Sequence, residues 1–512
     1  PNQSTSYKSA PDRTASFFGR ALYDYKNRYY ATLTVRADGS TKFAPGKQWG
    51  YFPAGSIAWR ISNEKWMKPI KFISDLKLRA SYGLAGNNRI GNDLWHNIYR
   101  VYSGTSAPAF GNEEYNYYQF ADQTYLYDPD LKWETTITRN IGLDFGFFRN
   151  RLSGTVDVYW NTTKDLLVPS IIPNSSGYSR QMTNVGQTSN KGVEISLDAK
   201  IIQTKDFQLS ANFNVAFNKN KVDKLATGET EWKTKASLSN WYGTYNYKME
   251  VGKSMGLIYG FVNDGFYKVD DFDFDATTKK WTLKPGIPDN SSFSSGNFAF
   301  KPGAMKFKKL SDSESNLITE DDMTVIGDTN PKVTGGFGLS GNWKNLDFTA
   351  FFNYMCDFDV LNVNKLYLHS AVRRNYSNLS TDMNLANRFR YVDDAGVNVS
   401  SDPVALAALN ENAKTYSWMS VTQGITMTDL VEDGSFLRLS TLTVGYTLPK
   451  HWLRSLGVKS LRLYFSGSNL FTITGYSGYD PEVNIQKGLT PGIDNNVTPR
   501  SRVYTVGVNL NF

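Results

Sequence analysis

The last eleven residues, 502–512, alternate between apolar side chains and small polar ones. Successive side chains of a strand point to opposite faces, so the apolar residues of this segment share one face. They are Tyr504, Val506, Val508, Leu510 and Phe512. A strand of a transmembrane β-barrel needs this pattern, because one face meets lipid and the other a wet lumen. The segment therefore predicts a final lipid-facing strand, and its apolar face is the predicted signal for barrel assembly.

The same alternation recurs along the chain. It predicts hairpins over 141–160, 193–217 and 337–354, and single strands near 15–25, 28–37, 49–60, 74–84, 435–448 and 459–470. In 435–448 the apolar phase changes, which predicts a β-bulge near Ser440 and Thr441. We expect about thirteen strands, or fifteen if 221–331 holds a further pair that includes 253–267.

The connections between these strands alternate between short and long. The long ones are 38–48, 85–131, 161–186, 221–331, 357–433 and 471–501. Transmembrane barrels have short periplasmic turns and long extracellular loops. A large soluble all-β protein has no reason to sort its loops in this way. The prediction is therefore an all-β fold, a transmembrane antiparallel β-barrel.

Composition agrees with this prediction. The 512 residues include 41 Gly and are 14% aromatic. Mean hydropathy is −0.43, and no run of 18 apolar residues predicts a membrane helix. The odd number of strands and a start in the middle of the pattern predict that this chain is a fragment. An open barrel would leave unpaired backbone groups in lipid, so we expect other strands to close it.

The net charge of +8 comes from scattered lysines and arginines. Nucleic acid binding is therefore not expected, whereas contact with lipid and lipopolysaccharide headgroups is. Cys356 is the one cysteine, and the three histidines are scattered. The GxGxxG match at 336–341 lies inside a predicted strand, where no dinucleotide site forms. We find no catalytic arrangement and expect neither an enzyme nor a required cofactor.

Nine segments, spread in order over nearly the whole chain, resemble SusC/RagA-type TonB-dependent outer-membrane transporters. They are VRADGS at 35–40, WGYFP at 49–53, WRIS at 59–62, LKLRASYG at 76–83, LKWETT at 131–136, NKGVE at 190–194, GSFLRL at 434–439, SNLF at 468–471 and YSGYDPEV at 476–483. The resemblance implies that residues 1–512 are the C-terminal part of a 22-stranded plugged barrel. The N-terminal plug and the first strands would then lie outside this chain.

The resemblance also implies a function. It suggests active import across the outer membrane of a Gram-negative bacterium, with a SusD-like surface lipoprotein as lid and the TonB complex acting through the absent N-terminal part. We expect an oligosaccharide as substrate, with a peptide as the alternative. A passive porin would close its barrel within one chain. A structural or assembly component of an outer-membrane complex is the other alternative.

Two groups of aromatic residues are candidates for sugar binding, because flat rings pack on the apolar faces of sugars. They are Trp241, Tyr242, Tyr245 and Tyr247 in one loop, and Tyr115 and Tyr117 in another. The alternative is that these rings belong to an interfacial girdle or to the core of a loop.

One acidic loop is a candidate calcium site. Asp312, Glu314 and Asn316 place oxygen ligands at alternate positions, as calcium loops do. Similar transporters carry a DxNxDG-like element near this point. This chain lacks the glycine and has Lys309 where the first acid would stand, so a solvated acidic loop is the alternative.

Overall fold

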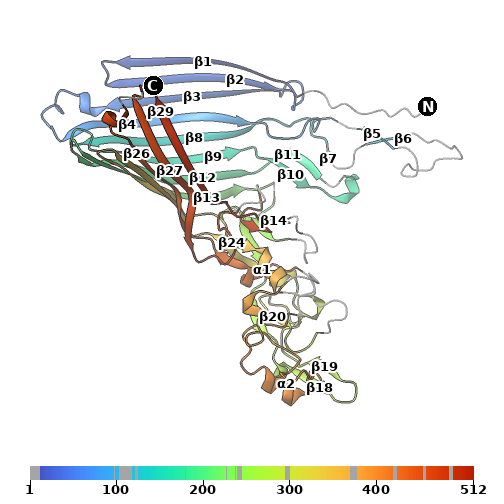
Figure 1. Ribbon diagram of the computed structural model, residues 1–512. Helices are drawn as coiled ribbons and strands as arrows, with labels where there is room; N and C mark the ends of the chain where they lie inside the picture. The colour runs from blue at the N-terminus through green and yellow to red at the C-terminus, as the bar shows by residue number, and fades with distance from the viewer. Residues whose placement is uncertain are drawn as a thin grey trace, which may run out of the picture. The chain divides into compact units, whose positions relative to one another are not determined.

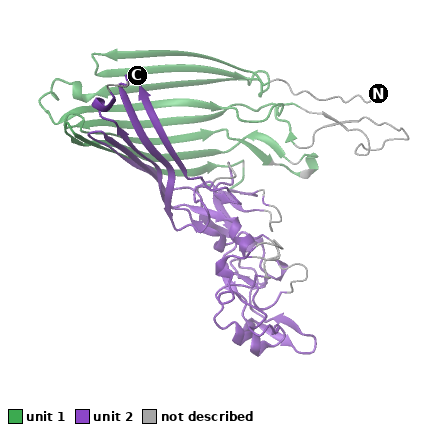
Figure 2. Ribbon diagram, viewed as in Figure 1, with its two compact units in different colours: residues 1–230, 251–253 green, residues 231–250, 254–512 purple. Residues whose placement is uncertain are grey.

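The computed structural model describes all residues except 1–11, 97–98, 103–117, 122–124, 179, 227, 237, 239–244, 294–299, 370–377, 419–423, 454–456 and 484–487. The chain divides into two compact units (Figure 2). The first unit holds residues 1–230 and 251–253, and the second holds 231–250 and 254–512.

Eight long strands form the sheet of the first unit and follow one another in sequence order (Figure 1). They are β1 (Thr14–Tyr25), β2 (Tyr29–Ser40), β3 (Trp49–Arg60), β4 (Ile73–Asn87), β8 (Glu134–Phe147), β9 (Leu152–Lys164), β12 (Gln187–Gln203) and β13 (Phe207–Lys224). Neighbouring strands are antiparallel. Each has at least 12 residues, more than the roughly 9–11 that a tilted strand needs to cross a membrane.

The register of these strands gives the sheet an apolar face. Ile57 lies opposite Ala80, Ala80 opposite Ile141, and Ile141 opposite Val158. The side chains stay exposed, since Ile57 is 66% and Ile141 47% accessible. An apolar face of this extent is stable only against lipid or another apolar surface.

The connections of the first unit are sorted by length with one exception to the prediction. At one end, 26–28, 148–151 and 204–206 are turns of three or four residues, and 61–72 has 12 residues. At the other end, 41–48 has only eight residues, whereas 88–133 and 165–186 are much longer loops. In the shortest turn, Lys26 and Asn27 have φ of 54° and 50°. Two successive positive φ values give a turn whose twist matches that of the flanking strands.

Short strands occur within the long loops of the first unit. They are β5 (Tyr99–Tyr102), β6 (Tyr118–Ala121), β7 (Tyr125–Leu126), β10 (Leu167–Ile171) and β11 (Arg180–Asn184). Phe43, Ile90 and Leu131 form a small buried cluster among these loops.

Five more long strands lie in the second unit, again in sequence order. They are β22 (Val333–Trp343), β23 (Leu346–Cys356), β26 (Phe436–Thr447), β27 (Ser460–Thr474) and β29 (Val503–Asn511). The register of β26 shifts between Leu439 and Thr441, so the predicted bulge is confirmed. The described residues thus hold thirteen long strands.

The final strand is β29, which pairs with β27. The side chains of Tyr504, Val506 and Phe512 are 62%, 81% and 75% accessible. Val508 and Leu510 are also exposed. The predicted lipid-facing strand is present, and its role as an assembly signal stays a prediction.

The long loops of the second unit fold into short elements around a core of their own. The strands are β14 (Glu231–Thr234), β15 (Tyr247–Glu250), β16 (Leu257–Gly260), β17 (Asn263–Phe266), β18 (Phe272–Asp275), β19 (Lys280–Leu283), β20 (Met305–Phe307), β21 (Thr324–Asp328), β24 (Asp359–Asn362), β25 (Val431–Asp433) and β28 (Ile493–Asp494). The helices of these loops are α1 (Val363–Leu368) and α2 (Pro403–Leu409), whereas α3 (Lys450–Leu453) lies in the short connection between β26 and β27. Among the described residues, no helix is at once long and apolar enough to cross a membrane.

The prediction of an additional membrane-crossing strand pair within 221–331 is wrong. Residues 257–260 and 263–266 are strands of four residues each, too short to cross a membrane. Their apolar side chains instead enter the loop core, where Ile258, Phe261 and Phe307 are almost fully buried. We call this core and the loops around it the loop lobe, residues 231–250, 254–331, 357–433 and 476–500.

Candidate functional site

The face of the first unit opposite the apolar one carries a ladder of ion pairs. Arg60 on β3 contacts Asp75 on β4 through two hydrogen bonds of 2.9 Å. Arg79 on β4 lies between Asp144 on β8, at 2.8 Å, and Asp157 on β9, at 3.1 Å. Bidentate arginine–carboxylate pairs have strict geometry, so they fix the strand register on a face where no apolar core does so.

A pocket of about 560 Å³ opens on this polar face, near the long loops. Arg36 and Ser16 both donate hydrogen bonds to Asp38, at 2.7 and 2.5 Å. The Arg36 side chain is still 56% exposed. Phe52 and Trp133 line the other side, with their rings edge to face at 5.5 Å.

Two glycines make room for the Phe52 ring. A Cβ at Gly50 or at Gly86 would overlap the ring of Phe52. Trp133 is fixed by a hydrogen bond of 2.9 Å from its Nε1 to the carbonyl of Gln48. The aromatic wall of the pocket therefore has one position, set by the glycines and by this hydrogen bond.

The pocket can bind a polar solute that also has an apolar face. Aromatic rings pack on such a face, while the guanidinium and the carboxylate bond to hydroxyl, amide or carboxylate groups. Sugars and peptides both have these features. We did not identify this pocket from sequence. One sequence feature could have indicated it: Phe52 is apolar, although the alternation along β3 places residue 52 on the polar face.

The aromatic residues predicted to bind sugar lie in different places. Trp241, Tyr242, Tyr115 and Tyr117 lie outside the described residues. Tyr245 packs, partly buried, against the core of the loop lobe. The Tyr247 ring is fully buried there, and its hydroxyl donates a hydrogen bond of 2.6 Å to the carbonyl of Pro491. Tyr247 thus has the loop-core position that was the alternative, with no free ring face for a sugar.

The acidic loop is organised around Lys309. Its ammonium lies 2.8 Å from the hydroxyl of Ser311, 2.9 Å from the carbonyl of Leu317 and 3.2 Å from buried Asp322. Asp312 and Glu314 point to solvent. Among the described residues, no three His, Cys, Asp or Glu side chains converge where they could hold a metal ion. Calcium at Asp312, Glu314 and Asn316 stays a prediction, and the cation in this loop is a lysine.

Two of the segments that carry the resemblance meet in the second unit. Arg438, from 434–439, is 2% exposed and contacts Asp480, from 476–483, at 2.5 Å. Glu482 lies 3.5 Å from Arg438 and 2.6 Å from Arg500. Burial works to raise the pKa of Asp480, but hydrogen bonds from the Glu482 backbone and from Arg438 hold it below its usual range. This group ties strand β26 to the loop that precedes β29.

A polar group around the buried His369 and Tyr416 of the loop lobe was also missed from sequence. His369 Nδ1 lies 3.0 Å from the Tyr416 hydroxyl, and His369 Nε2 lies 2.8 Å from Asp382. Burial lowers the pKa of His369. The three residues are far apart in sequence and have no motif, so no local signal could have indicated that they meet.

The family model described as "TonB dependent receptor-like, beta-barrel" matches residues 1–470. Among curated proteins, the chain is 32% identical over 503 residues to TonB-dependent receptor P3 of Formosa agariphila. That alignment covers 97% of this chain and 45% of the relative. TonB-dependent receptor SusC of Bacteroides thetaiotaomicron is 31% identical, with 97% of this chain and 43% of the relative covered.

Solved structures agree with these matches. The RagAB peptide transporter superposes with a TM-score of 0.73 and 27% sequence identity, covering 98% of this chain and 48% of that one. The RagAB peptide importer in its "open-open" state gives a TM-score of 0.70 at 25% identity, with 98% and 47% covered. The chain therefore spans less than half the length of these relatives.

Proposed function

We propose, from the premise that this chain belongs to the TonB-dependent receptor family and is of its SusC/RagA type, that the whole protein actively imports a nutrient across the outer membrane. One observation carries the proposal. The long strands of the first unit have an exposed apolar face and, opposite it, a continuous polar face crossed by ion pairs. Such a wall separates lipid from a wet passage.

We propose an oligosaccharide as the substrate. The pocket with Phe52 and Trp133 supports this, because its rings face a space that Arg36 and Asp38 line with polar groups. A peptide is the second candidate. The RagAB neighbours are described as peptide transporters, and the exposed Arg36 guanidinium suits a peptide carboxylate.

The proposed partners follow from the family. A SusD-like lipoprotein would cover the extracellular side, and TonB would act on the plug in the N-terminal part of the protein. The resemblance to SusC/RagA-type transporters supports a lipoprotein partner. A structural component of an outer-membrane complex stays an alternative, and such a component would carry no solute.

The test is uptake by cells that carry the full-length protein with its partners. Trp133→Ala removes one of the two rings of the aromatic wall. We expect uptake of labelled oligosaccharides to fall about tenfold, because the lost ring contact contributes roughly 1–1.5 kcal/mol. The matched control is Trp66→Ala, since Trp66 is 60% exposed in a short turn. Peptide uptake that falls while oligosaccharide uptake does not would establish the second candidate. If neither uptake depends on Trp133, the pocket is not a substrate site.

A further inference from the structure

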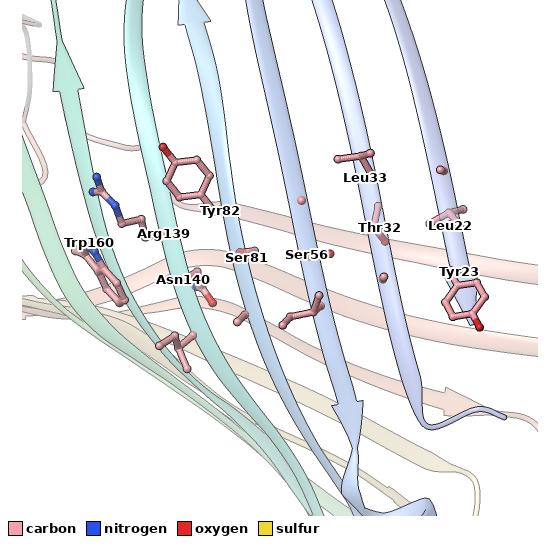
Figure 3. A pocket seen from close by; sticks show the side chains of 16 residues that line it. Leu22, Tyr23, Thr32, Leu33, Ser56, Ser81, Tyr82, Arg139, Asn140 and Trp160 are labelled. Carbon is pink, nitrogen blue, oxygen red and sulfur yellow. The ribbon is translucent and has the colours of Figure 1, made fainter. Parts of the chain in front are cut away.

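A groove of about 770 Å³ runs across the apolar face of the first unit (Figure 3). Its floor consists of the small residues Ala21, Ala31, Gly55 and Ala80. Larger side chains rise around this floor: Tyr23, Leu33, Ile57, Tyr82, Ile141 and Trp160. A volume of this size is typical of sites for small molecules. Because the groove lies on the lipid-facing side of the strands, we expect a lipid acyl chain to occupy it.

One end of the groove is positively charged. Arg139 lies there with Tyr82 and Trp160 (Figure 3). The register continues the row, since Trp160 lies opposite Lys191 and Lys191 opposite Lys219. With strands spaced about 4.8 Å apart, the row from Arg139 to Lys219 spans about 14 Å across the sheet.

The charged residues on this face are almost all positive. All residues of the eight strands are described, and their apolar face carries Arg139, Lys164, Lys191, Lys219 and Lys221. Its one carboxylate is Asp223, which accepts a hydrogen bond from Ser189 at 2.9 Å and lies 3.9 Å from Lys221. These cations all lie in the half of the strands near the long loops, the extracellular half.

A cation that faces hydrocarbon is costly, about 2–4 kcal/mol at the centre of a bilayer and less near the surface. Among the residues that the structure describes, no carboxylate forms an ion pair with Arg139. Its guanidinium lies over the Tyr82 ring at 6.0 Å and donates to the Thr162 hydroxyl at 3.2 Å. A guanidinium has five N–H donors and pairs well with phosphate, so an anion at this point would offset the cost of placing it there.

We propose that the groove and the cations Arg139, Lys191 and Lys219 form a binding site for the lipid A part of lipopolysaccharide. The row of cations meets the phosphates at the ends of the acylated disaccharide, and the groove takes one of its acyl chains. Charge complementarity selects this occupant. Phosphatidylglycerol carries one phosphate, whereas three separated cations suit a headgroup that carries two. The inference requires an outer-membrane location and does not depend on the substrate.

The test uses the full-length protein, purified from its outer membrane in mild detergent with its partners and titrated with purified lipid A under native mass spectrometry. The variant is the triple substitution Arg139→Gln, Lys191→Gln and Lys219→Gln. The control removes three exposed charges from the short turns at the other end, Lys26→Gln, Lys65→Gln and Lys205→Gln. Heat-modifiable migration on gels verifies that each variant forms a barrel.

We expect the triple variant to bind lipid A at least about tenfold more weakly than the wild type and the control, because charged hydrogen bonds to phosphate are lost. The wild-type protein should likewise bind dephosphorylated lipid A about tenfold more weakly than intact lipid A. Gly55→Leu fills the groove, and it is sterically tolerable because a Cβ there meets only the Thr32 carbonyl, at 3.6 Å. Gly55→Leu should weaken the binding of lipid A even though Arg139, Lys191 and Lys219 are all retained.

Three outcomes would overturn the proposal. The folded triple variant binds lipid A as tightly as the wild type, or the control loses binding equally, or phosphatidylglycerol binds as tightly as lipid A. The last result would make the face a general anionic surface instead of a site. Because uptake is not measured, failure here is distinguishable from failure of the proposed import function.

Discussion

At the scale of single residues, Asp322 shows how a loop with many charges is held in one conformation. Its side chain is fully buried and accepts hydrogen bonds from the backbone N–H groups of Leu310, Ser311 and Thr319, at 2.8 to 2.9 Å. Lys309 supplies the balancing positive charge at 3.2 Å. Together with the bond from Lys309 to the carbonyl of Leu317, the carboxylate joins residues 309–311 to residues 317–322 of the loop lobe.

Replacing Asp322 by Asn should open this loop. The neutral amide cannot accept all of these bonds and leaves Lys309 without its counterion, at a cost of about 3 kcal/mol. The amides of Leu310, Ser311 and Thr319 should then exchange with deuterium about 100-fold faster. Asp321→Asn, at an exposed position, is the control. Equal protection in both variants would contradict this account.

The same carboxylate predicts a dependence on pH. Burial alone would raise the pKa of Asp322, but the surrounding hydrogen bonds lower it to about 2. In the unfolded chain the pKa of this carboxyl is about 3.9. Its stabilisation is therefore complete above about pH 4 and is lost as the pH falls toward 2. Protection of the three amides, measured against pH, should fall in this window and should not do so in the Asn variant.

At the scale of elements, long strands are held in register by different means on their two faces. Apolar side chains from neighbouring strands line the outer face. On the polar face, arginine–aspartate pairs connect neighbouring strands. In the second unit, Arg438 extends this principle from a strand to a loop, since it holds Asp480 and Glu482 against β26.

Arg438→Met should release the loop that precedes β29. The substitution preserves much of the side-chain volume but leaves the carboxylates of Asp480 and Glu482 partly buried with less compensation, which costs about 3–5 kcal/mol for a buried pair. We expect faster proteolysis within 476–500 in the folded, full-length protein. Arg462→Met, which breaks the pair with Asp347 on the strands, is the matched control and should leave this loop resistant. Resistance of the loop in Arg438→Met would show that Arg438 does not hold it.

At the scale of the whole molecule, the strand edges decide what else the protein needs. Among the described residues, β1 pairs only with β2, and β29 only with β27. An unpaired strand edge in lipid leaves N–H and C=O groups without partners, at several kcal/mol each. We therefore expect the barrel to close only with strands from outside this chain.

Expression of residues 1–512 alone should yield no heat-modifiable barrel in detergent or lipid. The full-length protein, refolded in parallel, should yield one, because it supplies partners for both edges. Migration with and without heating distinguishes these states. A heat-modifiable barrel formed by residues 1–512 alone would show that the two edges can pair with each other.

Some features were predictable from sequence because they repeat locally. The strand positions, their two faces, the sorting of most loops by length and the bulge near Ser440 follow from a two-residue period and its interruption. The prediction for 253–267 failed for the same reason. A short apolar strand has the same alternation whether it faces lipid or a protein core, and local pattern cannot distinguish the two.

The sequence by itself determined that long strands alternate an apolar face with a polar one, and hence that one side of the sheet meets lipid. Only the tertiary structure decided which polar and aromatic residues meet. Arg36, Phe52 and Trp133 form one pocket, and Arg438 reaches Asp480 across 42 residues of sequence. The physical reason is that alternation is a property of neighbouring residues, whereas a pocket or a buried ion pair depends on register and loop packing between segments far apart in the chain.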